Sequence, residues 1–218
     1  MPQEENEQSW FDGFNMHMNT TFTHTDFRNY MDMVMDELPI IERHVPHGGR
    51  ILDVGCGLGC EAVPLSALGY NVTGIDNDPK VVDAVQENAR NFGKKINIIY
   101  GDIFNIDTRF GRDDFDACIS GGVLEHFPKE MIREVVDKQL SVAPIMIASM
   151  PFAKHPDVHK EYKDYVRRIC HDGMYRNLWT ETYWIKDILK GYNILEHSIQ
   201  KMHSSLGDFD LLYVVVGR

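Results

Sequence analysis

A cluster of glycines follows an apolar stretch near residue 50 and could bring a ligand against the backbone. The segment reads Asp53-Val54-Gly55-Cys56-Gly57-Leu58-Gly59 and leads into a predicted helix over 61–68. A glycine-rich turn between a strand and a helix lets a ligand approach the backbone and the positive end of the helix. The turn therefore predicts a ligand site, although it does not by itself specify the ligand.

Two classes of nucleotide ligand compete for this turn. A dinucleotide-binding turn has the spacing G-x-G-x-x-G, and its last glycine lets the helix pack closely on the strand. Here Cys60 stands at that last place, and the spacing is G-x-G-x-G. Asp53, two residues before the first glycine, would repel a pyrophosphate and attract an ammonium group. Both features disfavour a nucleotide-dependent oxidoreductase.

Two further carboxylates stand at the ends of predicted strands. Asp76 ends the predicted strand 70–76, where it can accept hydrogen bonds from both hydroxyls of a ribose. Asp102 follows the predicted strand 96–100, where it could accept from an adenine amino group. Open α/β sheets bind ligands at the carboxyl ends of their strands. Together with Asp53, these acids predict a ligand that has an ammonium, a ribose and an adenine.

The chain resembles the class I S-adenosylmethionine-dependent methyltransferases in four successive motifs. They are residues 53–59, Gly74-Ile75-Asp76, Gly101-Asp102 and Gly122-Val123-Leu124-Glu125-His126, in the family's order and spacing. The similarity covers about residues 48–150 by motif and 180–218 by strand order only. It implies an α/β fold with a doubly wound, seven-stranded and mostly parallel sheet (the Rossmann-like methyltransferase fold) whose last strand is antiparallel.

The resemblance implies S-adenosylmethionine as cofactor and gives ten residues a part in binding it. Asp53 would hold the amino group and Asp76 the ribose, while Ser120 and Gly121 would face the sulfonium end. The full set is Asp53, Gly55, Cys56, Gly57, Asp76, Asn77, Asp102, Ile103, Ser120 and Gly121. We expect the side chains of Cys56 and Cys60 to pack, and Glu61 to interact with the helix dipole rather than with a ligand.

The implied function is transfer of a methyl group from S-adenosylmethionine to a small-molecule acceptor. The Asn/Asp-Pro-Pro-aromatic signature of relatives that methylate DNA bases or glutamine amides is replaced here by Ser120-Gly121-Gly122-Val123. The Val-Leu-Glu-His segment resembles the group that acts on small metabolites. His126 is the candidate catalytic base; alternatively, it packs beside the cofactor. A non-catalytic module that binds S-adenosylmethionine and regulates a partner is the alternative function.

From residue 50 the hydrophobic pattern alternates between strands and helices, which is typical of a parallel sheet covered on both faces. The predicted strands are 50–54, 70–76, 96–100, 115–119, 144–150, 194–200 and 211–216. The predicted helices are 26–43, 61–68, 79–92, 129–142 and 181–189. We expect Thr25 or Asp26 to cap the first helix.

Two segments outside the motifs are expected to decide specificity. Residues 1–47 form an N-terminal lid or helical segment rich in aromatic and Met side chains, and 48–218 form the methyltransferase domain. An insertion at about 151–178 contains basic side chains that either recognise a carboxylate or phosphate or form a solvated helix face. His155 and His159 are four residues apart, but no carboxylate or Cys completes a ligand set, so no metal site is expected.

Composition narrows the partners and the compartment. A formal net charge of −11 repels phosphate backbones, so a nucleic acid is not expected as a partner. No apolar run is long enough to span a bilayer, and the start MPQEENEQSW is not a signal peptide. We therefore expect a cytoplasmic protein without a membrane partner. The four cysteines are too few for a disulfide scaffold, and the oligomeric state stays open.

Overall fold

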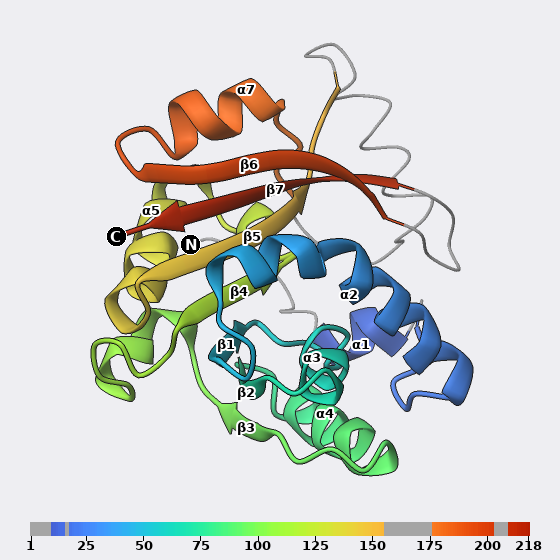
Figure 1. Ribbon diagram of the computed structural model, residues 1–218. Helices are drawn as coiled ribbons and strands as arrows, with labels where there is room; N and C mark the ends of the chain where they lie inside the picture. Colours follow the sequence, from blue (N-terminus) through green and yellow to red (C-terminus); the bar gives the residue numbers. More distant parts are fainter. Residues whose placement is uncertain (1–9, 16–17, 155–175, 203–208) are drawn as a thin grey trace, which may run out of the picture.

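The computed structural model describes residues 10–15, 18–154, 176–202 and 209–218 of the 218-residue chain. A seven-stranded sheet runs through the molecule in the order β3-β2-β1-β4-β5-β7-β6 (Figure 1). The strands are β1 (Arg50–Val54), β2 (Asn71–Asp76), β3 (Asn97–Tyr100), β4 (Ala117–Gly121), β5 (Ile145–Pro151), β6 (Asn193–Met202) and β7 (Phe209–Gly217). β7 is antiparallel to both of its neighbours, β5 and β6, whereas β1 to β5 pair in parallel. The predicted seven-stranded sheet with an antiparallel last strand is confirmed.

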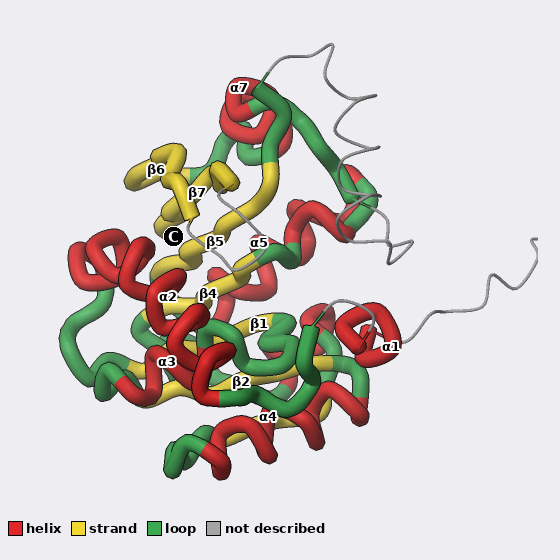
Figure 2. Tube along the Cα trace, turned by 90° about the vertical axis from the view of Figure 1, so that its right-hand side faces the viewer, coloured by secondary structure: helices red, strands yellow, loops and turns green. Residues whose placement is uncertain are grey.

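Helices cover both faces of this sheet, as the buried strands require. The α-helices are α1 (Trp10–Asn15), α2 (His24–His44), α3 (Ala62–Ala67), α4 (Pro79–Asn91), α5 (Lys129–Val142) and α7 (Glu181–Tyr183). Short 3-10 turns η1 (Ile103–Thr108) and η2 (Leu124–His126) follow β3 and β4, and a π-helical turn η4 (Trp184–Ile188) continues α7. Figure 2 shows the strands in a single twisted layer between these helices.

The strands divide the core into two main layers because successive side chains point to opposite faces. On one face Ile147 of β5 packs with α2 and α3, in a cluster that includes Ile41 and Leu65. On the other face Met146 and Ala148 pack with α5 and η4. Strands buried on both sides need nearly continuous apolar sequences, which is why β1, β4, β5 and β7 were recognisable from sequence.

The start of α2 differs from the prediction. The helix begins at His24 and its N-cap is Thr23, not Thr25 or Asp26. The Thr23 hydroxyl accepts from the Asp26 backbone N–H at 3.2 Å, and the Asp26 carboxylate accepts from the Thr23 N–H at 2.8 Å. This reciprocal pair is a capping box, in which the acid stands three residues after the cap. The predicted helix 181–189 is also corrected, because a three-residue α7 passes directly into the π-helical turn.

Three further observations bear on the remaining expectations. Cys56, Cys60 and Cys118 are free thiols, two of them buried. No helix within the described residues is long and apolar enough to cross a membrane. In the described ranges no three His, Cys, Asp or Glu side chains gather to hold a metal ion, and His155 and His159 lie outside those ranges.

The buried side chain of Asn88 helps to join the N-terminal segment to the rest of the fold. The Asn88 amide oxygen on α4 accepts from the Phe22 N–H at 2.8 Å. Its NH₂ group donates to the backbone oxygens of Thr20 and Leu58 at 3.1 and 3.0 Å. Asn88 thus connects the segment before α2, helix α4 and the glycine turn.

We expect Asn88→Ala to lower the free energy of unfolding by about 2–4 kcal/mol, because buried backbone groups lose their partners at a cost of roughly 1–3 kcal/mol each. Urea denaturation followed by circular dichroism measures this. Asn91→Ala, at an exposed position of the same helix, is the control and should change stability by less than about 0.5 kcal/mol. Equal effects of the two substitutions would contradict the bridging role.

Candidate active site

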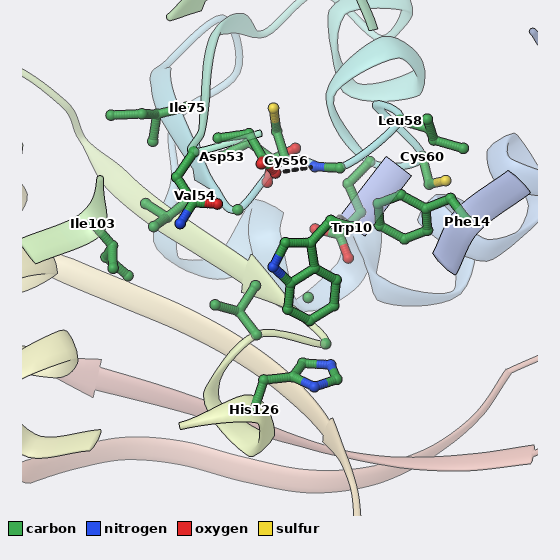
Figure 3. Close-up of a pocket in the computed structure, with 18 of the residues that line it drawn as sticks. Trp10, Phe14, Asp53, Val54, Cys56, Leu58, Cys60, Ile75, Ile103 and His126 are labelled. Atoms are coloured by element: carbon green, nitrogen blue, oxygen red, sulfur yellow. Dashed lines mark hydrogen bonds between the residues drawn. The ribbon is translucent and has the colours of Figure 1, made fainter. Parts of the chain in front are cut away.

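An open cavity of about 450 Å³ lies at the carboxyl ends of β1, β2 and β4 (Figure 3). In the sheet order, β1 has β2 on one side and β4 on the other, so the strand order reverses here. Open α/β sheets bind ligands at such a reversal because the connecting segments leave in opposite directions. Ligand pockets typically measure about 300–1,000 Å³, so the cavity can hold a small molecule.

The glycine turn after β1 forms one wall of the cavity. Gly55 and Gly57 have φ values of +70° and +50°, a conformation that other residues rarely adopt. A Cβ at Gly55 would lie 2.9 Å from Val123 Cγ2, and one at Gly57 would lie 3.2 Å from Phe14 Cζ. The N–H groups of Gly55 and Cys56 both donate to the Ile75 oxygen, at 2.8 and 3.1 Å. The turn is therefore tied to β2 and has no room for side chains.

Asp76, at the end of β2, organises the same wall. One carboxylate oxygen accepts from the Gly57 N–H at 3.1 Å and the other from the Asp78 N–H at 3.0 Å. Burial raises the pKa of Asp76, while these backbone donors oppose the increase. Asp78 in turn caps α4 and accepts from the Phe11 N–H at 3.0 Å, which attaches α1 beside the cavity.

Most of the residues predicted from sequence line this cavity. They are Asp53, Gly55, Cys56, Gly57, Asp76, Asn77, Ile103, Gly121 and His126. Two do not. The Asp102 carboxylate accepts from the Phe104 N–H at 3.0 Å and caps η1. The Ser120 hydroxyl is fully buried and donates to Gln139 Oε1 of α5 at 2.6 Å. The structure thus places these two side chains away from the cavity lining.

Three acidic side chains gather behind the glycine turn. Burial first, and then the charges of Glu61 and Asp76, raise the pKa of Asp53 well above its ordinary value. Burial likewise raises the pKa of Glu61 to about 7. The pKa of Glu37 on α2 is also raised, chiefly by burial and by the charge of Glu61. Carboxylates that share a buried site resist ionising together, so the cluster favours a bound cation.

Sequence reasoning missed two members of this cluster. Glu61 is the N-cap residue of α3 but makes no side-chain capping hydrogen bond, and it lines the cavity instead. The expectation that Glu61 only interacts with the helix dipole is therefore incomplete. For Glu37 the sequence does contain a signal, namely an acid on the apolar face of a predicted helix. It lies on the buried face of α2 with Val34, Ile40 and Ile41.

The opposite end of the cavity is aromatic. The indole of Trp10 on α1 lies edge-on to the imidazole of His126, with ring centroids 4.8 Å apart. In the view of Figure 3, Trp10 lies between His126 and Asp53. Phe127 and Arg176 also line the cavity, while Phe14 lies nearer the glycine turn, against Gly57. His126 Nε2 lies 3.9 Å from Glu125 Oε1, and burial raises the pKa of Glu125 to about 7.

Comparison with known proteins bears directly on this arrangement. Residues 51–143, which carry the glycine turn, Asp53, Asp76 and His126, match the family model described as a methyltransferase domain. This part of the chain therefore resembles a methyltransferase domain.

Curated relatives of this part of the chain include methyltransferases that are named for different pathways or substrates. A ubiquinone biosynthesis O-methyltransferase of Methylocella silvestris is 36% identical over 88 residues, which are 39% of this chain and 34% of that protein. A ribosomal protein L11 methyltransferase of Thermosipho africanus is 33% identical over 127 residues, 56% of this chain and 48% of that protein. The matches span less than half of each relative.

Solved structures resemble the whole fold. Magnesium protoporphyrin IX methyltransferase from Synechocystis PCC 6803, with bound S-adenosylhomocysteine, has a TM-score of 0.66 at 22% identity and covers 95% of this chain and 94% of its own. The 1,6-didemethyltoxoflavin-N1-methyltransferase of Burkholderia thailandensis has a TM-score of 0.63 at 15% identity, and the match covers 86% of this chain and 78% of that one. These likenesses concern the fold, and the predicted resemblance to class I methyltransferases is confirmed.

Burial of Glu61 makes a prediction about stability. Its folded pKa of about 7 exceeds the ordinary 4.5, so the folded state binds the proton more tightly and loses stability as pH rises from about 4.5 to 7. Above pH 7, Glu61→Gln should raise the free energy of unfolding of the ligand-free protein by about 1–3 kcal/mol.

The measurement is urea denaturation at about pH 8 and about pH 4, and the gain should disappear at the lower pH because the carboxyl is then protonated in both states. Glu87→Gln, at an exposed position of α4, serves as the control and should change stability little at either pH. A Gln variant that is less stable than the wild type at pH 8 would contradict the prediction.

Proposed function

We propose that this protein transfers a methyl group from S-adenosylmethionine to a small-molecule acceptor. The observation that carries the proposal is one cavity that combines the glycine turn, two strand-end carboxylates and His126 within a methyltransferase domain. The relatives and solved structures named above are methyltransferases, and both of those structures hold S-adenosylhomocysteine, which supports the choice of cofactor.

The residues present fit this cofactor. Asp53 is buried, and its Oδ2 makes no hydrogen bond within the described structure, so it can accept one from an ammonium group. Asp76 stands at the end of β2, where a ribose would lie. Ile75 and Ile103 add apolar surface for an adenine. Gly55 and Gly57 leave space that a side chain would fill.

The cofactor supplies a methyl group on a sulfonium, which is already a good leaving group. The chain's own residues would therefore act mainly by positioning, which in well-oriented model reactions lowers the barrier by about 7–11 kcal/mol. Trp10 and Phe14 on α1 line the cavity, and we propose that α1 acts as a lid that excludes water during the transfer. His126 would accept a proton from a hydroxyl acceptor, and Trp10 and Glu125 beside it restrain its ring.

We infer that a small acceptor suits the aromatic end of the cavity better than a protein or a nucleic acid. Trp10, Phe14 and Phe127 can contact a planar ring, and Arg176 could attract an acidic group on it. The net charge of −11 opposes a nucleic-acid acceptor. The ubiquinone-biosynthesis relative is consistent with a small aromatic acceptor, whereas the L11 methyltransferase has a protein acceptor by name.

The cofactor assignment is tested with Asp76→Ala. Removing the carboxylate deletes its hydrogen bonds to a ribose and to Gly57, and charge-assisted hydrogen bonds contribute about 1.5–3 kcal/mol each. We therefore expect the Kd for S-adenosylhomocysteine to rise on the order of 100-fold or more by calorimetry. Asp83→Ala, on the exposed face of α4, should bind like the wild type. Unchanged affinity in Asp76→Ala would refute the ribose assignment.

Catalysis is tested by incubating the protein with methyl-labelled S-adenosylmethionine and cell extract and identifying the labelled product. With that product's precursor, His126→Ala should lower kcat on the order of 100-fold, as general bases contribute about 10²–10⁴-fold, while the affinity for S-adenosylhomocysteine is kept. Label that appears in no extract, although the cofactor binds, would favour a binding module without catalysis.

A further inference from the structure

Glu61 extends across the cavity instead of capping its own helix. It occupies the N-cap position of α3 without a side-chain hydrogen bond to that helix. A Cβ added to Gly121, at the end of β4, would lie only 1.8 Å from Glu61 Oε1. The carboxylate therefore lies directly against the Gly121 backbone, and this contact is possible only because residue 121 has no side chain. Both residues line the cavity.

Asp53 approaches the same place from the neighbouring strand. β1 and β4 are paired, with Asp53 opposite Ile119, two residues before Gly121. The side chain of Asp53 is 3% exposed, it lines the cavity, and its Oδ2 has no hydrogen-bond partner among the described residues. A buried acceptor without a donor is costly, so this oxygen is suited to a donor that arrives with a ligand.

The groups that act on this pair are acidic or neutral. Glu37 on α2 and Asp76 on β2 contribute negative charge. Burial, together with neighbouring carboxylates that include Glu61, raises the pKa values of Cys60 and Tyr213. One hydrogen bond to the Glu37 carboxylate comes from the Tyr213 hydroxyl, which donates to Oε2 at 3.2 Å. The basic side chains of the lining, His126 and Arg176, accompany Glu125 at the aromatic end.

We propose that Glu61 and Asp53 form a two-carboxylate clamp for a primary ammonium group, and that binding of this ammonium expels a proton from the clamp. An ammonium carries three N–H donors and can satisfy both carboxylates at once. The inference rests on the proposed function, since the amino-acid end of S-adenosylmethionine supplies the ammonium. Glu61 is thereby a ligand-binding residue as well as the N-cap residue of α3.

The proton linkage follows from the electrostatics of the clamp. In the free protein the two carboxylates and Glu37 repel one another, so part of the cluster holds a proton near pH 7. A cation between them favours the charged forms and displaces that proton. The affinity for an ammonium-bearing ligand should therefore rise with pH up to about 7 and level off above it, by at most tenfold per pH unit for one linked proton.

The experiment compares two ligands by calorimetry at pH 6.5 in buffers with different ionisation enthalpies. S-adenosylhomocysteine has the ammonium, whereas 5′-methylthioadenosine has the same nucleoside without the amino-acid end. Wild-type protein should release up to one proton with the first ligand and none with the second. In Glu61→Gln, proton release should fall to near zero. The Kd for S-adenosylhomocysteine should rise about 10–100-fold, because one charge-assisted hydrogen bond is lost.

Binding of 5′-methylthioadenosine to Glu61→Gln should be unchanged, which shows that the cavity is intact. Glu87→Gln, on the exposed face of α4, should behave as wild type with both ligands. The clamp is overturned if Glu61→Gln releases the wild-type number of protons, or if the wild-type affinity for S-adenosylhomocysteine follows the same pH profile as that for 5′-methylthioadenosine. Wild-type protein that binds neither ligand overturns the proposed function, and the clamp with it.

Discussion

The hydrogen bond from the Gly57 N–H to the Asp76 carboxylate joins the two strand ends on which the cavity is built. Gly57 can make it because its φ is positive, and Asp76 is available because β2 ends there beside β1. The same carboxylate orders the start of α4 through Asp78, which also attaches α1. One acid thus aligns the turn, a helix and the N-terminal segment before any ligand is present.

The N-terminal segment belongs to the site although it precedes the sheet in sequence. Asn88 and Asp78 hold it on α4 through its backbone, and this brings Trp10 against His126 and Phe14 against Gly57. Aromatic surface is thereby placed opposite the strand ends, where an acceptor would meet the cofactor.

Buried acids lower the stability of the free protein and would favour a bound cation. Burial raises the pKa values of Asp53, Glu61 and Glu37, and the charges of neighbouring carboxylates raise those of Asp53 and Glu37 further. A ligand cation would relieve this repulsion, so binding and stability are linked through the same groups. Strain of this kind is common at functional sites, where local rules yield to the requirements of the ligand.

The order of the strands and helices, the glycine turn, and the places of Asp53 and Asp76 at strand ends could be predicted from the sequence, because periodicity and motif spacing are local properties. The directions of the Glu61, Ser120 and Asp102 side chains, and Thr23 as the cap of α2, emerge from the packed fold. It also brought Glu37 and Trp10 to the site. These outcomes depend on which distant segments pack together, since a side chain turns toward the donor, the space or the charge that another element supplies.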